Sequence, residues 1–138
     1  MGEAGGRGSG IEPEGGGAGP EQTSLRRVGG AALEIVGEPR DEGRGLLLRG
    51  ELDLACAALL ERRLERLLDD GAERIVLEMS EVTFMDSTGL RTLLVGAERC
   101  RAAGGELLLG EVSRQVERLL EISGAAGELR RVEAEAED

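Results

Sequence analysis

Strand-like segments recur along the chain and are separated by glycine and proline positions. Residues 31–36 and 46–53 are apolar stretches joined through a glycine-bracketed turn, which predicts a β-hairpin. Residues 74–79 alternate between apolar and polar side chains and predict another strand. Three consecutive leucines at 107–109 indicate a strand buried on both faces, and residues 129–132 predict a last short strand.

Apolar side chains at helical spacing fill the segments between these strands. Residues 56–67 carry one such stripe, with Asp53 placed to cap the helix and Gly71 to end it. Residues 90–100 carry a second stripe, and residues 113–123 carry a third. The resulting order, β-β-α-β-α-β-α, predicts an α/β fold in which helices pack against a mixed, largely parallel sheet.

The two ends of the chain differ in composition from its middle. The first segment is rich in glycine, and such a segment buries too little apolar surface to offset the entropy lost on ordering. We therefore expect residues 1–27 to be a disordered tail and residues 28–132 to form a single domain. Residues 133–138 are expected to be an acidic tail.

Composition removes most catalytic and binding chemistries. The chain has no histidine, and all 17 basic residues are arginine, so histidine-based nucleophile pairs and lysine-based sites are excluded. A net charge of -11 argues against nucleic acid or an anionic membrane as a partner. Cys56 and Cys100 are expected to be small buried thiols in a reducing, cytoplasmic location. We expect no cofactor and no metal.

The segment between the third predicted strand and the second predicted helix holds the candidate chemistry. It spans residues 80–87, and the helix is expected to begin at Thr88 or Gly89. Open α/β sheets place functional crevices at the carboxyl ends of their strands, and a helix amino terminus favours a phosphate group. Local chemistry alone favours the simpler interpretation of an ordinary helix start, with Phe84 and Met85 anchoring the loop in the core.

Four blocks in the same order carry a resemblance to a known family. They are Arg-Gly-Glu-Leu-Asp at 49–53, Val-Leu-Glu-Met-Ser-Glu-Val at 76–82, Phe-Met-Asp-Ser-Thr-Gly-Leu at 84–90, and the strand and helix within 105–124. Together they make residues 28–132 resemble the STAS domain, and within it the anti-sigma factor antagonists. Two features depart from the family pattern: the long glycine-rich tail, and Leu-Ala-Cys after Asp53, where relatives often have Ser or Thr.

The resemblance implies a phosphorylation switch rather than an enzyme. Ser87 is the implied acceptor for a serine kinase that is also the anti-sigma factor. The unphosphorylated form binds this partner and frees the sigma factor, and a PP2C-type serine phosphatase resets the switch. The resemblance also implies partner binding by Asp53, Asp86, Ser87, Thr88 and Gly89, although helix capping explains Asp53 and Thr88 equally well.

Two other functions stay open on the sequence. One is a STAS interaction module, in a signalling or transport assembly, that works without phosphorylation. The other is a carboxylate-metal hydrolase that uses Asp53 and Asp86, which the absence of histidine and lysine disfavours. The first alternative predicts partner binding that is insensitive to Ser87→Glu, and the second predicts metal-dependent turnover.

Overall fold

The computed structural model describes residues 23–28 and 31–132. These residues form a single sheet with helices packed against it. Within these residues the sheet has six strands in the order β2-β3-β4-β5-β6-β7. The strands are β2 (Thr23–Val28), β3 (Ala31–Glu38), β4 (Arg44–Leu52), β5 (Arg74–Met85), β6 (Glu106–Val112) and β7 (Arg130–Arg131). The helices are α1 (Ala57–Asp69), α2 (Ser87–Ala102), α3 (Arg114–Ser123) and the short 3-10 helix η1 (Ala126–Glu128).

The pairing of the strands confirms the mixed, largely parallel sheet. β3 is antiparallel to both β2 and β4, so the predicted hairpin is present. β4, β5, β6 and β7 are parallel to one another in sequence order. The carboxyl ends of β4, β5 and β6 therefore lie along one edge of the sheet, and each is followed by the start of a helix.

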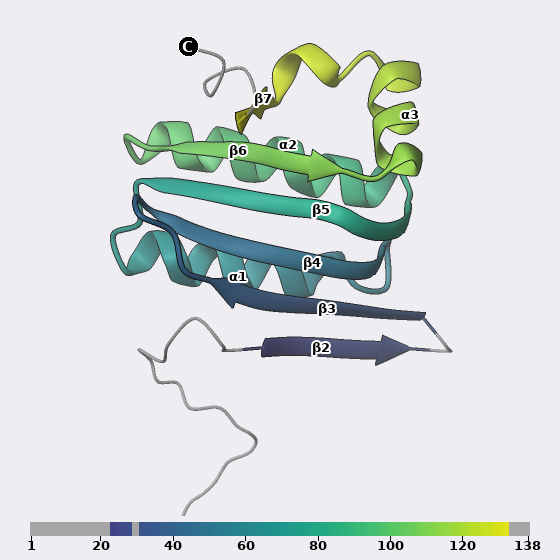
Figure 1. Ribbon diagram of the computed structural model, residues 1–138, viewed down its shortest axis with the longest axis horizontal. Helices are drawn as coiled ribbons and strands as arrows, with labels where there is room; N and C mark the ends of the chain where they lie inside the picture. The colour runs from purple at the N-terminus through teal and green to yellow at the C-terminus, as the bar shows by residue number, and fades with distance from the viewer. Residues whose placement is uncertain (1–22, 29–30, 133–138) are drawn as a thin grey trace, which may run out of the picture.

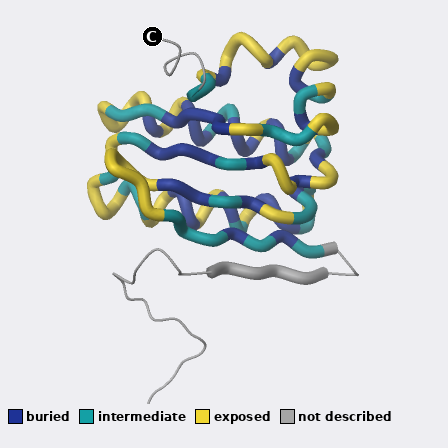
Figure 2. The backbone as a smooth tube through the Cα atoms, viewed as in Figure 1, coloured by how far each residue is buried: buried dark blue, intermediate teal, exposed yellow. Residues whose placement is uncertain are grey.

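The hydrophobic core lies mainly between the sheet and the helices α1 and α2, and α3 adds Val116 and Leu120. Figure 1 shows α1 and α2 on the same face of the sheet, with α3 beyond the end of β5 and β6. Inward side chains of the sheet, such as Leu48, Leu77 and Leu109, meet the apolar stripes of these helices, and the buried segments follow the central strands in Figure 2. Gly96 lets the two helices approach, because a Cβ there would lie 2.9 Å from Leu64 Cδ1. None of the helices within residues 31–132 is long and apolar enough to cross a bilayer.

The strand expected to end at residue 79 is six residues longer in the structure. β5 continues to Met85, so most of the expected loop at 80–87 is strand. Polar residues make this segment look like a loop, but they alternate irregularly with Val82 and Met85, which are both buried. A shift in register between Gly50 and Glu51 of the neighbouring strand accommodates the irregularity. The expected loop thus shrinks to the junction at Asp86.

The expected boundary between tail and domain falls inside a strand. β2 covers residues 23–28 and pairs with β3 from Val28↔Ala31 to Thr23↔Val36. The end of the expected tail, residues 23–27, is therefore part of the sheet. This segment forms a strand because it pairs with β3. Backbone hydrogen bonds can hold a mostly polar strand at the edge of a sheet. Residues 1–22 and the acidic tail at 133–138 lie outside the described residues.

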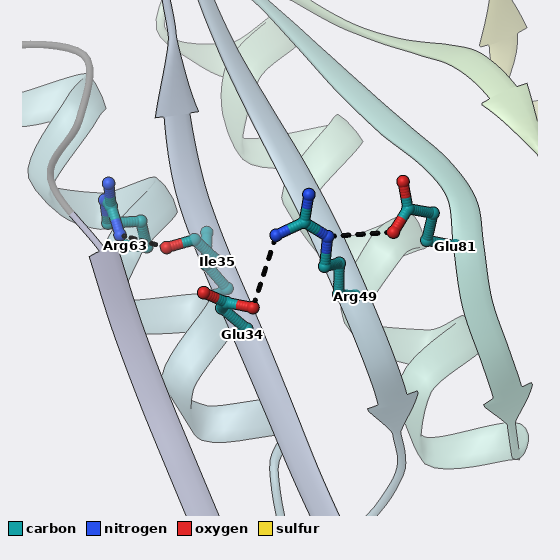
Figure 3. Close-up of polar contacts among 5 residues, drawn as sticks. All are labelled: Glu34, Ile35, Arg49, Arg63 and Glu81. Atoms are coloured by element: carbon teal, nitrogen blue, oxygen red, sulfur yellow. Dashed lines mark hydrogen bonds and ion pairs between the residues drawn. The ribbon is translucent and has the colours of Figure 1, made fainter.

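A charged row crosses three strands on the sheet. Arg49 of β4 lies between Glu34 of β3 and Glu81 of β5 (Figure 3). Its Nε donates to Glu81 Oε1 at 2.8 Å, and its Nη1 lies 3.5 Å from Glu34 Oε1. The hydrogen bond to Glu81 is the largest cause that raises the pKa of the guanidinium. All three side chains are solvent-accessible, so these ion pairs are expected to contribute little to the stability of the fold.

A buried arginine joins α1 to the hairpin. Arg63 is almost fully buried, and its Nη1 donates to the carbonyl oxygen of Ile35 at 3.5 Å (Figure 3). Burial is the main cause that lowers the pKa of this guanidinium, and the charge of Arg66 lowers it further. The guanidinium nevertheless remains charged near neutral pH, because the ordinary arginine pKa is very high.

Both cysteines are buried thiols, as the sequence predicted. Burial raises the pKa of Cys100, so the reactive thiolate is scarcer at neutral pH than at an exposed cysteine. We expect iodoacetamide to label the native protein at least about tenfold more slowly than the denatured protein. Mass spectrometry of timed samples at neutral pH measures both rates. Equal rates in the two states would contradict this placement of the thiols.

Candidate functional site

Three helices begin along the carboxyl edge of the parallel strands. Asp53 follows β4, Asp86 follows β5, and Ser113 follows β6 as the residue that caps α3. Helix amino termini carry unpaired N–H groups and a positive partial charge. The candidate segment therefore lies at the carboxyl edge of the parallel strands, where helix amino termini partly compensate negative charge.

Asp86 is the centre of this edge. It is the residue that caps α2, and its Oδ1 accepts a hydrogen bond from the backbone N–H of Gly89 at 3.0 Å. Its Oδ2 accepts a second bond from the backbone N–H of Leu54 at 3.3 Å. Its own N–H donates to the carbonyl of Leu52 at 3.4 Å. Asp86 thus ties the start of α2 to the turn that follows β4.

Ser87 is the first residue of α2, and its side chain is exposed. An exposed hydroxyl at a helix start is accessible to a protein kinase, and a phosphate placed there meets the unpaired N–H groups of the first turn. Because Asp86 provides the cap, neither Ser87 nor Thr88 is needed for that role. Thr88 is half-buried, and its carbonyl accepts a hydrogen bond from Thr92 Oγ1 at 3.0 Å.

Gly89 is buried and serves packing. A Cβ at this position would collide with the carbonyl oxygen of Leu52 and would lie 2.8 Å from Met85 Cγ. Only glycine lets the first turn of α2 approach the end of β4 this closely. The structure therefore separates Gly89 from the exposed members of the predicted partner-binding set.

Asp53 was predicted to cap the first helix, but its side chain instead binds the turn that precedes α1. Its Oδ1 accepts hydrogen bonds from the backbone N–H groups of Ala55 at 3.1 Å and Cys56 at 3.2 Å. The α1 helix itself starts at Ala57, with Cys56 as its first flanking residue and no side-chain cap. Asp53 thus fixes the turn between β4 and α1, and this turn contains Leu54.

No sequence pattern singled out Leu54 or Gln115 for this site, and Phe84 is more exposed than expected. Leu54 has 76% of its surface exposed, and Phe84 has 43% exposed, although Phe84 was expected to anchor the loop in the core. Met85 does anchor it and is 2% exposed. Gln115 of α3 accepts a hydrogen bond from the Met85 N–H through Oε1 at 3.1 Å. The apolar type of Leu54 was visible in the sequence, but the Gln115 contact depends on tertiary structure alone.

The carboxylates at this edge are poorly suited to bind a metal. Both oxygens of Asp86, and Oδ1 of Asp53, already accept backbone hydrogen bonds. Among the residues that the structure describes, no group of three or more Asp, Glu, Cys or His side chains is placed to hold an ion. The geometry gives no support to a carboxylate-metal hydrolase.

Comparison with known proteins covers most of the folded chain. The profile of the STAS domain family matches residues 40–137. BtrV of Bordetella bronchiseptica is 38% identical over 77 residues, which are 56% of this chain and 66% of that protein. The anti-sigma-B factor antagonist of Bacillus subtilis is 36% identical over 78 residues, which are 56% of this chain and 70% of that protein.

Solved structures share the fold. The anti-sigma factor antagonist SpoIIAA of Bacillus, in its unphosphorylated form, superposes with a TM-score of 0.59 at 24% identity, covering 85% of this chain and 94% of SpoIIAA. Its phosphorylated form gives 0.54 at 23% identity, covering 74% and 95%. Family membership confirms that the chain is a regulatory domain and not an enzyme. The chain belongs to the STAS domain family.

Proposed function

We propose that this chain is an anti-sigma factor antagonist controlled by phosphorylation of Ser87. In its unphosphorylated form it binds an anti-sigma factor that has serine kinase activity, and the sigma factor is released. Phosphorylation of Ser87 abolishes this binding, and a PP2C-type serine phosphatase restores it. The switch operates in the cytoplasm.

The observation that carries the proposal is an exposed serine at a helix start, directly beside a carboxylate. Ser87 begins α2, and the preceding residue, Asp86, has both oxygens held in place by backbone hydrogen bonds. A phosphate adds about -1.5 to -2 charges at this point. The helix terminus tolerates these charges, but a partner that covers the edge must desolvate them next to Asp86. Relatives that are named anti-sigma factor antagonists lend support.

The partner-binding surface in this proposal consists of the exposed and half-buried groups around Ser87. Asp53 and Asp86 supply carboxylates, and Thr88 supplies a hydroxyl on the first turn of α2. Gly89 acts indirectly, because it sets how closely this turn approaches β4. A net charge of -11 is consistent with a protein partner and not with nucleic acid or an anionic membrane.

The test begins with a kinase from the native lysate. Ser87→Ala, used as bait, is expected to retain the kinase because it cannot be phosphorylated. The purified kinase with ATP should then phosphorylate the unmodified protein and Thr88→Ala, but not Ser87→Ala, as mapped by mass spectrometry. Incorporation into Ser87→Ala at the normal rate would remove Ser87 as the acceptor. Ser87→Ala and Thr88→Ala control for each other, because each variant removes one hydroxyl and keeps the other as a possible acceptor.

A further inference from the structure

The turn after β4 presents the most exposed large apolar side chain at the candidate edge. Leu54 is 76% exposed, while its backbone N–H is bonded to Asp86 Oδ2. The carboxylates of Asp86 and Asp53 lie at the backbone of the same turn, because they accept hydrogen bonds from the N–H groups of Leu54 and of the next residue, Ala55. Interface cores are apolar with a polar rim, and an exposed leucine in a turn whose backbone is bonded to two carboxylates matches that arrangement on a small scale.

The two hydrogen bonds of the Asp86 carboxylate are unequal. The bond from Gly89 N is 3.0 Å long, half-buried and favoured by the helix terminus. The bond from Leu54 N is 3.3 Å long and exposed, so it is the weaker of the two. We therefore expect a new negative charge that repels this carboxylate to weaken the bond to Leu54 before the bond to Gly89. Ser87, the adjacent residue, is where such a charge would arise.

We propose that Leu54 is the apolar contact that this edge offers to its protein partner, and that Asp86 keeps its hydrogen bond to the Leu54 N–H only while Ser87 is unphosphorylated. The inference rests on the proposed function and adds the chemistry of the contact. The partner surface that fits is an apolar pocket bordered by basic groups, which complements Leu54 and the carboxylates of Asp53 and Asp86.

The release is local in this scheme. Phosphate on Ser87 repels the Asp86 carboxylate, the Leu54 N–H loses its acceptor, and the turn at Leu54 is then held only by its bonds to Asp53. The bonds from Ala55 and Cys56 to Asp53 do not involve Asp86, so α1 keeps its start. Phosphorylation then weakens binding in two ways, through charge at the interface and through an apolar contact that is less preorganised.

The first test needs no partner. Phosphoserine is installed at position 87 of the full chain by genetic-code expansion, and amide exchange with solvent is measured by NMR. The Leu54 amide is expected to exchange about tenfold faster than in the unmodified protein, while the Gly89 amide changes less than about twofold. Phosphoserine at Ser80 is the matched control, because Ser80 is exposed on β5 and adds the same charge away from this turn.

Variants of Asp86 calibrate this measurement. Asp86→Ala removes both acceptors and sets the exchange rate of a released Leu54 amide. Asp86→Asn keeps one oxygen to cap α2. This variant replaces Asp86→Ala as the reference for Leu54 exchange if the alanine variant does not fold. Leu54 exchange that stays unchanged with phosphoserine at 87, or rises equally with phosphoserine at 80, would overturn the role of Asp86.

The second test uses the kinase that phosphorylates Ser87. Leu54→Ala is expected to weaken its binding about tenfold or more, because an exposed apolar contact is lost. Ile122→Ala is the matched control, since Ile122 is 73% exposed near the carboxyl end of α3. Equal binding by both variants, with normal phosphorylation of Ser87, would overturn the Leu54 contact alone. Absence of any kinase for Ser87 would overturn the proposed function, and the contact with it.

Discussion

Ser87→Glu is expected to weaken binding of the anti-sigma factor by more than about a hundredfold, which corresponds to ~3 kcal/mol. The glutamate introduces a charge beside Asp86 at the start of α2, where a partner bound as proposed would exclude water. Phosphoserine carries about twice that charge and should weaken binding further. Ser87→Ala should bind as tightly as the unmodified protein, because it adds no charge.

Isothermal titration of the purified kinase with each variant measures these affinities. Ser80→Glu is the control for net charge, since Ser80 is exposed on β5 and its substitution should change affinity by less than about threefold. If Ser87→Glu binds as tightly as Ser80→Glu, the chain is a STAS interaction module that works without phosphorylation. That outcome would leave the fold and the family unaffected.

Gly89→Ala is expected to destabilise the domain by about 2–4 kcal/mol. Alanine ordinarily stabilises a helix by up to about 1 kcal/mol relative to glycine, so propensity alone predicts the opposite sign. Here the added methyl group collides with the Leu52 carbonyl, a backbone atom that cannot move without shifting the end of β4. The collision outweighs the propensity. Urea denaturation followed by circular dichroism gives the change in free energy of unfolding.

Gly127→Ala is the matched control for this substitution. A Cβ at Gly127 would meet no atom within 4 Å, so the change in stability should stay within about 0.5 kcal/mol. Because the first turn of α2 also carries Ser87, Gly89→Ala should slow phosphorylation of Ser87 even under conditions where the variant is folded. A stability equal to that of Gly127→Ala would contradict the close approach of α2 to β4.

The order of elements was predictable because most segments bury one regular face. The stripes at 56–67 and 90–100 fall within or beside α1 and α2, and the hairpin of β3 and β4 was recovered from its turn. The end of β5 was not predictable, because Val82 and Met85 are buried at an irregular spacing. The register shift in the neighbouring strand permits this spacing. β2 was missed for a different reason, since its position depends on pairing with β3 and not on an apolar pattern.

The location of the candidate site was also predictable, but its internal contacts were not. A hydroxyl after β5 must lie at the carboxyl edge of a parallel sheet, so the position of Ser87 follows from topology. The assignment of Asp86, and not Thr88, as the helix cap depends on backbone angles that the sequence does not specify. The bonds from Leu54 to Asp86 and from Met85 to Gln115 join residues about thirty positions apart, and no local pattern encodes them.

This separation along the chain has a consequence for protein synthesis. Leu54 and Asp86 are 32 positions apart, and they meet only after β4 and β5 have paired. A nascent chain that has not yet emerged past β5 therefore has Leu54 without its acceptor and lacks Ser87 altogether. Non-local pairing of this kind forms late relative to helices and turns. An interaction that needs both residues in place would thus select chains in which β4 and β5 have already paired.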